Sequence, residues 1–148
     1  MCGPAGSGKS TYARRLERAG MVRLSFDVEL WRRGVSAAPV PAELKDEVEA
    51  VLRSRLLDLV AQGCDVVLDF SFWSRRMRDD YRRLLAPTGV VPETVYLATD
   101  RATVLTRVRA RQGEGADDVV LTEELATRYF DHFEPPTPDE GPLTVVGP

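Results

Sequence analysis

The chain opens with residues whose types and spacing are typical of a phosphate-binding loop. Within "CGPAGSGKST", the pattern G-x-x-x-x-G-K-[ST] is complete. In such a loop the glycines let backbone N–H groups approach the phosphates, the lysine reaches the β- and γ-phosphates, and the serine hydroxyl binds Mg²⁺. The helix that follows directs its positive end toward the same anion. The residues expected to hold the nucleotide phosphates are Gly3, Gly6, Ser7, Gly8, Lys9, Ser10 and Thr11.

The chain lacks the characteristic motifs of two classes of phosphate-loop protein, the hydrolytic motors and the GTP switches. Hydrolytic motors usually carry a glutamate directly after the strand aspartate, where it activates water, but Asp69 is followed by Phe70. GTP switches read guanine with an Asn-Lys-x-Asp stretch, and Lys9 and Lys45 are the only lysines. The sequence therefore argues against a motor and against a GTP switch.

Helical and strand patterns alternate along the chain. The stretches with helical spacing and end signals are 11–19, 42–62, 74–85, 102–112 and 122–133. The short apolar runs typical of strands are "MVRLSF", "CDVVLDF", "ETVYLAT" and "PLTVV". We expect residues 42–62 to form the longest helix and Thr122 to cap the last one. The alternation predicts a doubly wound parallel α/β sheet, with its ligand at the carboxyl ends of the strands.

The composition narrows the class of protein further. The 148 residues fit one domain, 1–148, and carry a net charge of −3, which argues against nucleic acid bound by bulk electrostatics. No apolar run approaches the roughly 20 residues that a membrane span needs. Cys2 and Cys64 are too few for a disulfide scaffold. We expect a soluble, cytoplasmic protein with no membrane or nucleic-acid partner.

Four stretches together carry a resemblance to a known group. The phosphate loop, "LSFD", "VVLDFSFWSRRMRD" and "VLTRVRAR" resemble the small P-loop kinases related to polynucleotide kinase, zeta toxin, gluconate kinase and chloramphenicol phosphotransferase. The resemblance covers essentially the whole chain. It implies a P-loop NTPase fold of the nucleoside-monophosphate-kinase type, a three-layer sandwich with parallel sheet order 2-3-1-4-5. It also implies transfer of a phosphoryl group from ATP to a hydroxyl, with Mg²⁺ held by Ser10 and by Asp69, the match to the Walker B acid.

By the same resemblance, Asp27 matches the acid that orients and deprotonates the acceptor hydroxyl. An alternative interpretation makes Asp27 the N-cap of a helix that starts at Val28. Many relatives carry an arginine three residues after this acid, whereas Leu30 stands there and the arginines are Arg32 and Arg33. The identity of the acceptor is therefore left open, with Arg32 a candidate contact.

Further acceptor candidates follow Asp69. Phe72 replaces an asparagine of the relatives, and Arg78 fills the position of their arginine. Phe72 and Trp73 could form an apolar or stacking wall for the acceptor, and core packing is the equal alternative. Arg78 shares one helical face with Arg75 and Arg82, which we interpret as a solvated, ion-paired face with Arg78 as the functional exception.

Residues 107–122 have the features of a lid. Arg107 and Arg111 lie four apart, on one face of the predicted helix, and lead into the glycine-rich "GEGADD". By resemblance Arg107 lies over the adenine and Arg111 contacts the transferring phosphate, while Arg109 points elsewhere. The alternative makes both arginines surface partners of acids in the loop, namely Glu114, Asp117 and Asp118. His132 is expected to be a packing residue or helix-end cation.

These observations favour a kinase for the hydroxyl of a small molecule, using ATP and Mg²⁺. Two other functions stay open, a polynucleotide 5′-hydroxyl kinase and an ATP-binding module without transfer activity. The former would need an electropositive groove leading to Asp27.

The amino end raises a separate expectation. In the order 2-3-1-4-5 the strand before the phosphate loop is central, yet only Met1 and Cys2 precede Gly3. Each unsatisfied buried backbone group costs roughly 1–3 kcal/mol. We therefore expect a truncated first strand, with about three to six further residues, mostly Val, Ile or Leu, before Met1. Alternatively, a neighbouring segment or a partner strand fills the gap.

Overall fold

The chain alternates helices and short strands, as the sequence predicts. The computed structural model describes residues 1–117 and 119–147. Its α-helices are α1 (Lys9–Arg18), α2 (Phe26–Arg32), α3 (Ala42–Ala61), α4 (Arg75–Leu85), α5 (Arg101–Arg109) and α6 (Glu123–Asp131). Its 3₁₀ turns are η1 (Ala86–Thr88) and η2 (Pro138–Glu140). Its strands are β1 (Val22–Ser25), β2 (Val66–Asp69), β3 (Thr94–Leu97) and β4 (Leu143–Val146).

Polar side chains fix where several helices begin. Each of these side chains accepts a hydrogen bond from a backbone N–H in the first turn, which satisfies a donor that has no partner within the helix. The capping residues are Ser25, Ser74, Asp100 and Thr122. The predicted cap at Thr122 is confirmed, and α3 is the longest of the described helices, as expected.

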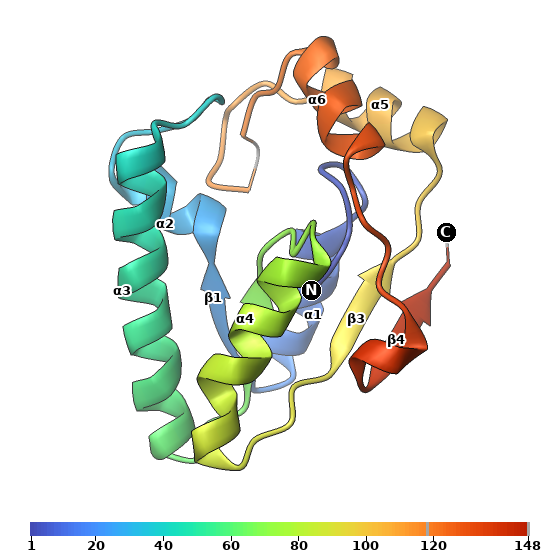
Figure 1. Cartoon of the computed structure of the whole chain (residues 1–148). Coiled ribbons are helices and arrows are strands. Elements are labelled where there is room, and N and C mark those ends of the chain that lie inside the picture. Colours follow the sequence, from blue (N-terminus) through green and yellow to red (C-terminus); the bar gives the residue numbers. More distant parts are fainter. Residues whose placement is uncertain (118, 148) are drawn as a thin grey trace.

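The strands form two parallel pairs with residues 1–3 between them. β1 pairs with β2, and β3 pairs with β4. Toward the β1–β2 pair, the Met1 nitrogen donates to the Leu68 carbonyl of β2 at 2.8 Å. Toward the β3–β4 pair, the Cys2 nitrogen donates to the Val95 carbonyl of β3 at 2.8 Å, and the Leu97 nitrogen donates to the Cys2 carbonyl at 2.9 Å. Residues 1–3 do not form a strand of their own, so the five-stranded order remains a prediction; Figure 1 shows the amino end in the middle of the molecule.

Apolar layers cover both faces of the strands. On one face, α3 and α4 bury Leu52 and Tyr81 against Leu24 and Phe70. On the other face, Ala13 of α1 packs with Val67 and Leu97, among others. Figure 1 shows α4 in front of the strands and α1 behind them. The chain is thus an α/β protein in three layers, as predicted.

The segments that follow the strands meet at one edge. Residues 1–3 lead into the phosphate loop, β1 leads into α2, β2 into the loop before α4, and β3 into α5. A site at this edge is the expected position in a parallel α/β sheet. None of the helices described has the length and apolar character needed to cross a membrane.

Candidate active site

The phosphate loop requires glycine at two positions where the backbone turns sharply. Gly8 is the N-cap of α1 and has a φ of 99°, in the left-handed region. Gly6 has a φ of 83°, and a Cβ placed on it would lie 2.8 Å from the Val104 carbonyl oxygen of α5. L-residues with a side chain rarely adopt this region. Glycine at these positions therefore lets the loop pass close to α5 and turn directly into α1.

Polar groups in this loop fit a bound phosphate. The hydroxyl of Ser7 is buried without a hydrogen-bond partner in the described part of the chain. The Lys9 ammonium donates to the Pro4 carbonyl at 2.9 Å, so its side chain lies back over the loop. The first turn of α1 begins at Lys9, and its N–H groups have no partner within the helix. Because an orphaned buried donor is costly, this loop suits an anionic ligand that accepts hydrogen bonds.

Lys9 shares a buried environment with two carboxylates. Burial lowers the pKa of Lys9, and the charges of Asp69 and Asp27 oppose that shift. Asp69 ends β2 and is buried, and its register partner on β1 is Ser25. Asp27 lies two residues beyond Ser25, in α2. The parallel pairing of β1 with β2 thus brings both predicted acids to the lysine of the phosphate loop.

The structure rejects the capping interpretation of Asp27. The N-cap of α2 is Ser25, whose Oγ accepts from the Val28 nitrogen at 3.3 Å. Asp27 is in the first turn, and burial raises the pKa of its carboxyl group, opposed mainly by the charge of Lys9. A raised pKa makes the carboxylate a stronger base, which suits the role predicted for it.

An arginine that the sequence analysis did not identify also reaches this site. Arg23 of β1 donates from Nε to Oδ2 of Asp69 at 3.0 Å. Its Nη2 bonds both to Asp69 and to Asp117, in the predicted lid. The signal available in the sequence was a charged residue inside the apolar run "MVRLSF". Buried charges need a partner, so Arg23 could have been marked as a candidate.

The two lid arginines contact different parts of the site. Arg107 donates to the Gly6 carbonyl at 3.2 Å, so it lies against the phosphate loop. α5 ends at Arg109, so Arg111 lies beyond it, and the prediction that both arginines share a helical face is wrong. Arg111 donates to the Val119 carbonyl at 2.9 Å, and its charge acts on both Lys9 and Asp27.

The acids proposed as alternative partners of these arginines lie in the same loop. Asp117 pairs with Arg23 and, at 3.7 Å, with Arg14. Asp118 lies outside the described residues. Arg109 pairs instead with Glu123, in an exposed contact with Nε at 3.0 Å from Oε2. The separate direction predicted for Arg109 is confirmed.

Comparisons with known proteins identify the family. A family model described as AAA domain matches residues 1–136. The chain belongs to this AAA-domain family. No curated protein matches it.

Solved structures share the fold of this AAA domain. A gluconokinase from Sinorhizobium meliloti 1021 is similar at 23% identity and a TM-score of 0.67, over 99% of this chain and 79% of the gluconokinase. Chaetomium thermophilum Kti12 in complex with ADP-AlF3 is similar at 21% identity and a TM-score of 0.71, over 99% of this chain and 86% of Kti12. The predicted resemblance is thus confirmed at the level of the fold, and the chain has a P-loop kinase-like fold.

The candidates for acceptor binding in this AAA domain differ in exposure. Phe72 is buried and stacks on Phe70, with ring centroids 5.5 Å apart, which supports the alternative of core packing. Trp73 is 50% exposed and so remains available to a ligand. Arg32 is exposed and lies 3.5 Å from Glu29. Roles for Trp73 and Arg32 at the acceptor stay predictions.

The helical face with three arginines is ion-paired, but it is not solvated throughout. Arg75 and Arg82 pair with acids at partly exposed positions, as expected. Arg78, predicted as the functional exception on this face, is indeed not solvated, because it is buried and pairs with Glu140. Its guanidinium also donates to the Phe72 carbonyl at 2.9 Å. These contacts give Arg78 a structural role beneath the site and do not support its assignment to the acceptor.

The single histidine of this AAA domain lies at a helix end. His132 is the C-cap of α6, and its Nδ1 lies 2.8 Å from the Arg128 carbonyl oxygen. The prediction of a helix-end position is confirmed.

Proposed function

We propose that this AAA domain is an ATP- and Mg²⁺-dependent kinase that transfers the γ-phosphoryl group to a hydroxyl of a small molecule. The observation that carries the proposal is the placement of Asp27. This carboxylate does not belong to the phosphate loop, yet it is close enough to Lys9 and Asp69 for their charges to act on it. An ATP-binding module has no need of such an acid, whereas a kinase needs a base beside the transferred group.

Each residue has a distinct part in the transfer. Lys9 and the loop N–H groups hold the phosphates, while Ser10 and Asp69 would hold Mg²⁺. When bound, Mg²⁺ neutralises charge on the phosphate oxygens. Asp27 orients the acceptor hydroxyl and takes its proton. The acceptor oxygen bonds to the γ-phosphorus as the bond to the β–γ bridging oxygen breaks, and ADP leaves.

The lid arginines complete the proposed site. Arg107 lies against the phosphate loop, where it donates to the Gly6 carbonyl, and we assign it to the bound nucleotide for this reason. Arg111 carries a positive charge close enough to influence Lys9 and Asp27, where negative charge develops during transfer. We assign Arg111 to the transferring phosphate for this reason. Its planar guanidinium can donate two parallel hydrogen bonds to phosphate oxygens.

Two observations favour a small acceptor over a polynucleotide. The net charge of −3 provides no general attraction for a phosphate backbone. A gluconokinase also shares this fold, and by its name it acts on a small molecule.

An acceptor screen tests the proposal. The protein is incubated with MgATP labelled at the γ-phosphate and with pools of small hydroxyl compounds and 5′-hydroxyl oligonucleotides. We expect labelled product from a small hydroxyl compound, and at least about 10²-fold slower formation of that product with Asp27→Asn. Asp46→Asn, at an exposed position of α3, is the matched control and should react like the wild type. Tight ATP binding without transfer to any pool would contradict the proposal in favour of an ATP-binding module, and labelled oligonucleotides alone would favour a polynucleotide kinase.

A further inference from the structure

Arg23 connects the lid to the carboxylate at the end of β2. Its side chain is 8% exposed and contacts Asp69, at 2% exposure, and Asp117, at 16%. Arg23 lies on β1, Asp69 ends the neighbouring strand β2, and Asp117 lies in the loop after α5. One guanidinium therefore joins three segments that are far apart in the sequence. Arginine suits this bridging position because its fork of donors can serve two carboxylates at once.

The charges around Arg23 explain why the bridge matters. The charged groups gathered at this edge of the strands include the carboxylates of Asp27, Asp69 and Asp117 and the cations of Lys9, Arg14, Arg23 and Arg111. Like charges repel strongly where water is largely excluded. Without the guanidinium, Asp117 and Asp69 would lose the one cation that contacts both carboxylates in the described part of the chain, although Arg14 would still lie 3.7 Å from Asp117. The lid would then keep its observed position only against the repulsion between these two carboxylates.

Other lid contacts in this region include the ion pair of Asp117 with Arg14, at 3.7 Å, and two backbone hydrogen bonds. Val120 donates to the Ser36 carbonyl at 3.0 Å, and Ala38 donates to the Val120 carbonyl at 3.1 Å. These bonds join the lid to the segment between α2 and α3. They do not involve the Asp69 carboxylate. Among the contacts described for the lid, the one that reaches this acid runs through Arg23.

We propose that Arg23 is a positioning residue that couples the lid to the metal-supporting carboxylate, holding Asp69 in orientation and Asp117 in its observed position with one guanidinium. The part that concerns Mg²⁺ rests on the proposed function. The part that concerns the lid does not, because it is a property of the protein without nucleotide. Loss of Arg23 should therefore change both the lid and the dependence on Mg²⁺, whereas loss of Asp117 should change the lid alone.

Three variants and a control separate these effects. The variants are Arg23→Gln, Asp117→Asn and the double variant. The control is Arg109→Gln, which breaks an exposed Arg–Glu pair at the edge of the same lid. Two quantities are measured on the full chain. One is amide hydrogen exchange of residues 112–117 without nucleotide, and the other is the Kd for ATP, with excess Mg²⁺ and with EDTA.

The expected results differ between variants. Arg23→Gln should speed lid exchange at least about 10-fold and weaken MgATP binding about 10- to 100-fold, as for other residues that orient a metal ligand. Its Kd for ATP in EDTA should stay within about threefold of the wild-type value, because the phosphate loop is unchanged. Asp117→Asn should speed lid exchange and leave the Mg²⁺ dependence unchanged. The double variant should exchange no faster than Arg23→Gln, and the control should match the wild type in both measurements.

Several outcomes would overturn the coupling. A folded Arg23→Gln variant with wild-type lid exchange and Mg²⁺ dependence would overturn it. So would an equal loss of ATP affinity with and without Mg²⁺ together with faster exchange throughout the core, since that is the signature of a purely structural residue. If Arg23→Gln does not fold, unchanged lid exchange in Asp117→Asn contradicts the coupling. If the wild type binds no ATP, the proposed function fails, and lid exchange still tests the link between Arg23 and Asp117.

Discussion

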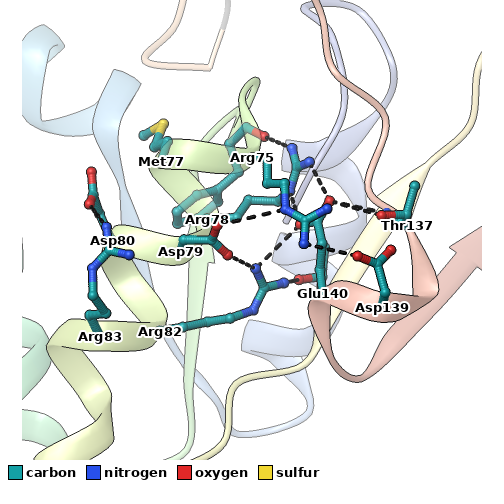
Figure 2. Close-up of polar contacts among 12 residues, drawn as sticks. Arg75, Met77, Arg78, Asp79, Asp80, Arg82, Arg83, Thr137, Asp139 and Glu140 are labelled. Atoms are coloured by element: carbon teal, nitrogen blue, oxygen red, sulfur yellow. Dashed lines mark hydrogen bonds and ion pairs between the residues drawn. The ribbon is translucent and has the colours of Figure 1, made fainter.

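Arg78 and Glu140 form a buried, two-pronged ion pair between segments 62 residues apart. Nε of Arg78 donates to Oε2 at 2.7 Å and Nη2 donates to Oε1 at 2.8 Å, with both side chains 2% exposed. Figure 2 shows the pair between α4 and the segment that contains Thr137 and Asp139. Arg78 also bonds to the carbonyls of Phe72 and Glu134. The pair therefore holds the segment before β4 against the loop that follows Asp69.

Loss of the glutamate should destabilise the fold strongly. Glu140→Gln leaves Arg78 charged and buried without its counter-ion, which typically costs about 3–5 kcal/mol. The free energy of unfolding from denaturant titration measures this. Asp139→Asn is the control, because Asp139 pairs with Arg75 at exposed positions and should cost less than about 1 kcal/mol. Similar losses in the two variants would contradict a special role for the buried pair.

The same pair should make stability depend on acid pH. Hydrogen bonds from Arg78 hold the pKa of Glu140 at about 2, below the ordinary value of 4.5. A lowered carboxyl pKa stabilises the fold fully above the unfolded-state value, and this contribution is lost as pH falls from about 4.5 to about 2. It amounts to about 3 kcal/mol. In the Glu140→Gln variant the unfolding free energy should lack this part of its pH dependence. If the unfolding free energies of the variant and the wild type fell equally between pH 4.5 and 2, Glu140 would not be the source of the dependence.

The sequence predicted local features of this fold better than contacts between distant segments. The glycine spacing of the phosphate loop, the apolar spacing of α3 and the cap at Thr122 are signals within a few residues, and each was predicted. Arg23 was missed because its bonds depend on the pairing of β1 with β2 and on the position of the lid. Arg78 was misread because its partner lies in a segment with no sequence signal relating it to α4.

Near the site, short-range ambiguity limited the predictions. Ser25 and Asp27 are both good N-cap residues, and the sequence alone does not decide between them. The structure assigns the cap to Ser25, which leaves the Asp27 carboxylate free of the capping role. The predicted end of α5 lies too far along the chain, because no glycine or proline separates Arg109 from Arg111. Arg107 and Arg111 were therefore assigned to the same helix.

Lys9 should be required for nucleotide binding. Lys9→Ala removes a charged donor to the phosphates and should weaken ATP binding about 10- to 100-fold, the range for a hydrogen bond to a charged group. Lys45 is the other lysine of the chain and is exposed on α3, so Lys45→Ala is a matched control. Titration of each variant with ATP measures the effect. Equal affinities for the two variants would exclude the phosphate role of Lys9.

The two arginines at the end of α5 should differ in their effect on transfer. If Arg111 contacts the transferring phosphate, Arg111→Ala should lower turnover by about 10³-fold, the lower limit for such arginines. Arg109→Ala should change turnover little, because Arg109 pairs with Glu123 at the surface. Turnover is measured with saturating MgATP and an acceptor found in the screen. Similar losses at both positions would indicate a general charge effect instead.

The most direct test of the account is the rate of phosphoryl transfer by Asp27→Asn, measured in a single turnover beside its affinity for MgATP. Asparagine has nearly the same shape but cannot take the proton of the acceptor hydroxyl. The account predicts a rate lowered by about 10²- to 10⁴-fold, with ATP affinity within a few-fold of the wild-type value. A wild-type transfer rate in the Asp27→Asn variant would contradict the assignment of Asp27 as the base, and with it the placement on which the proposed kinase activity rests.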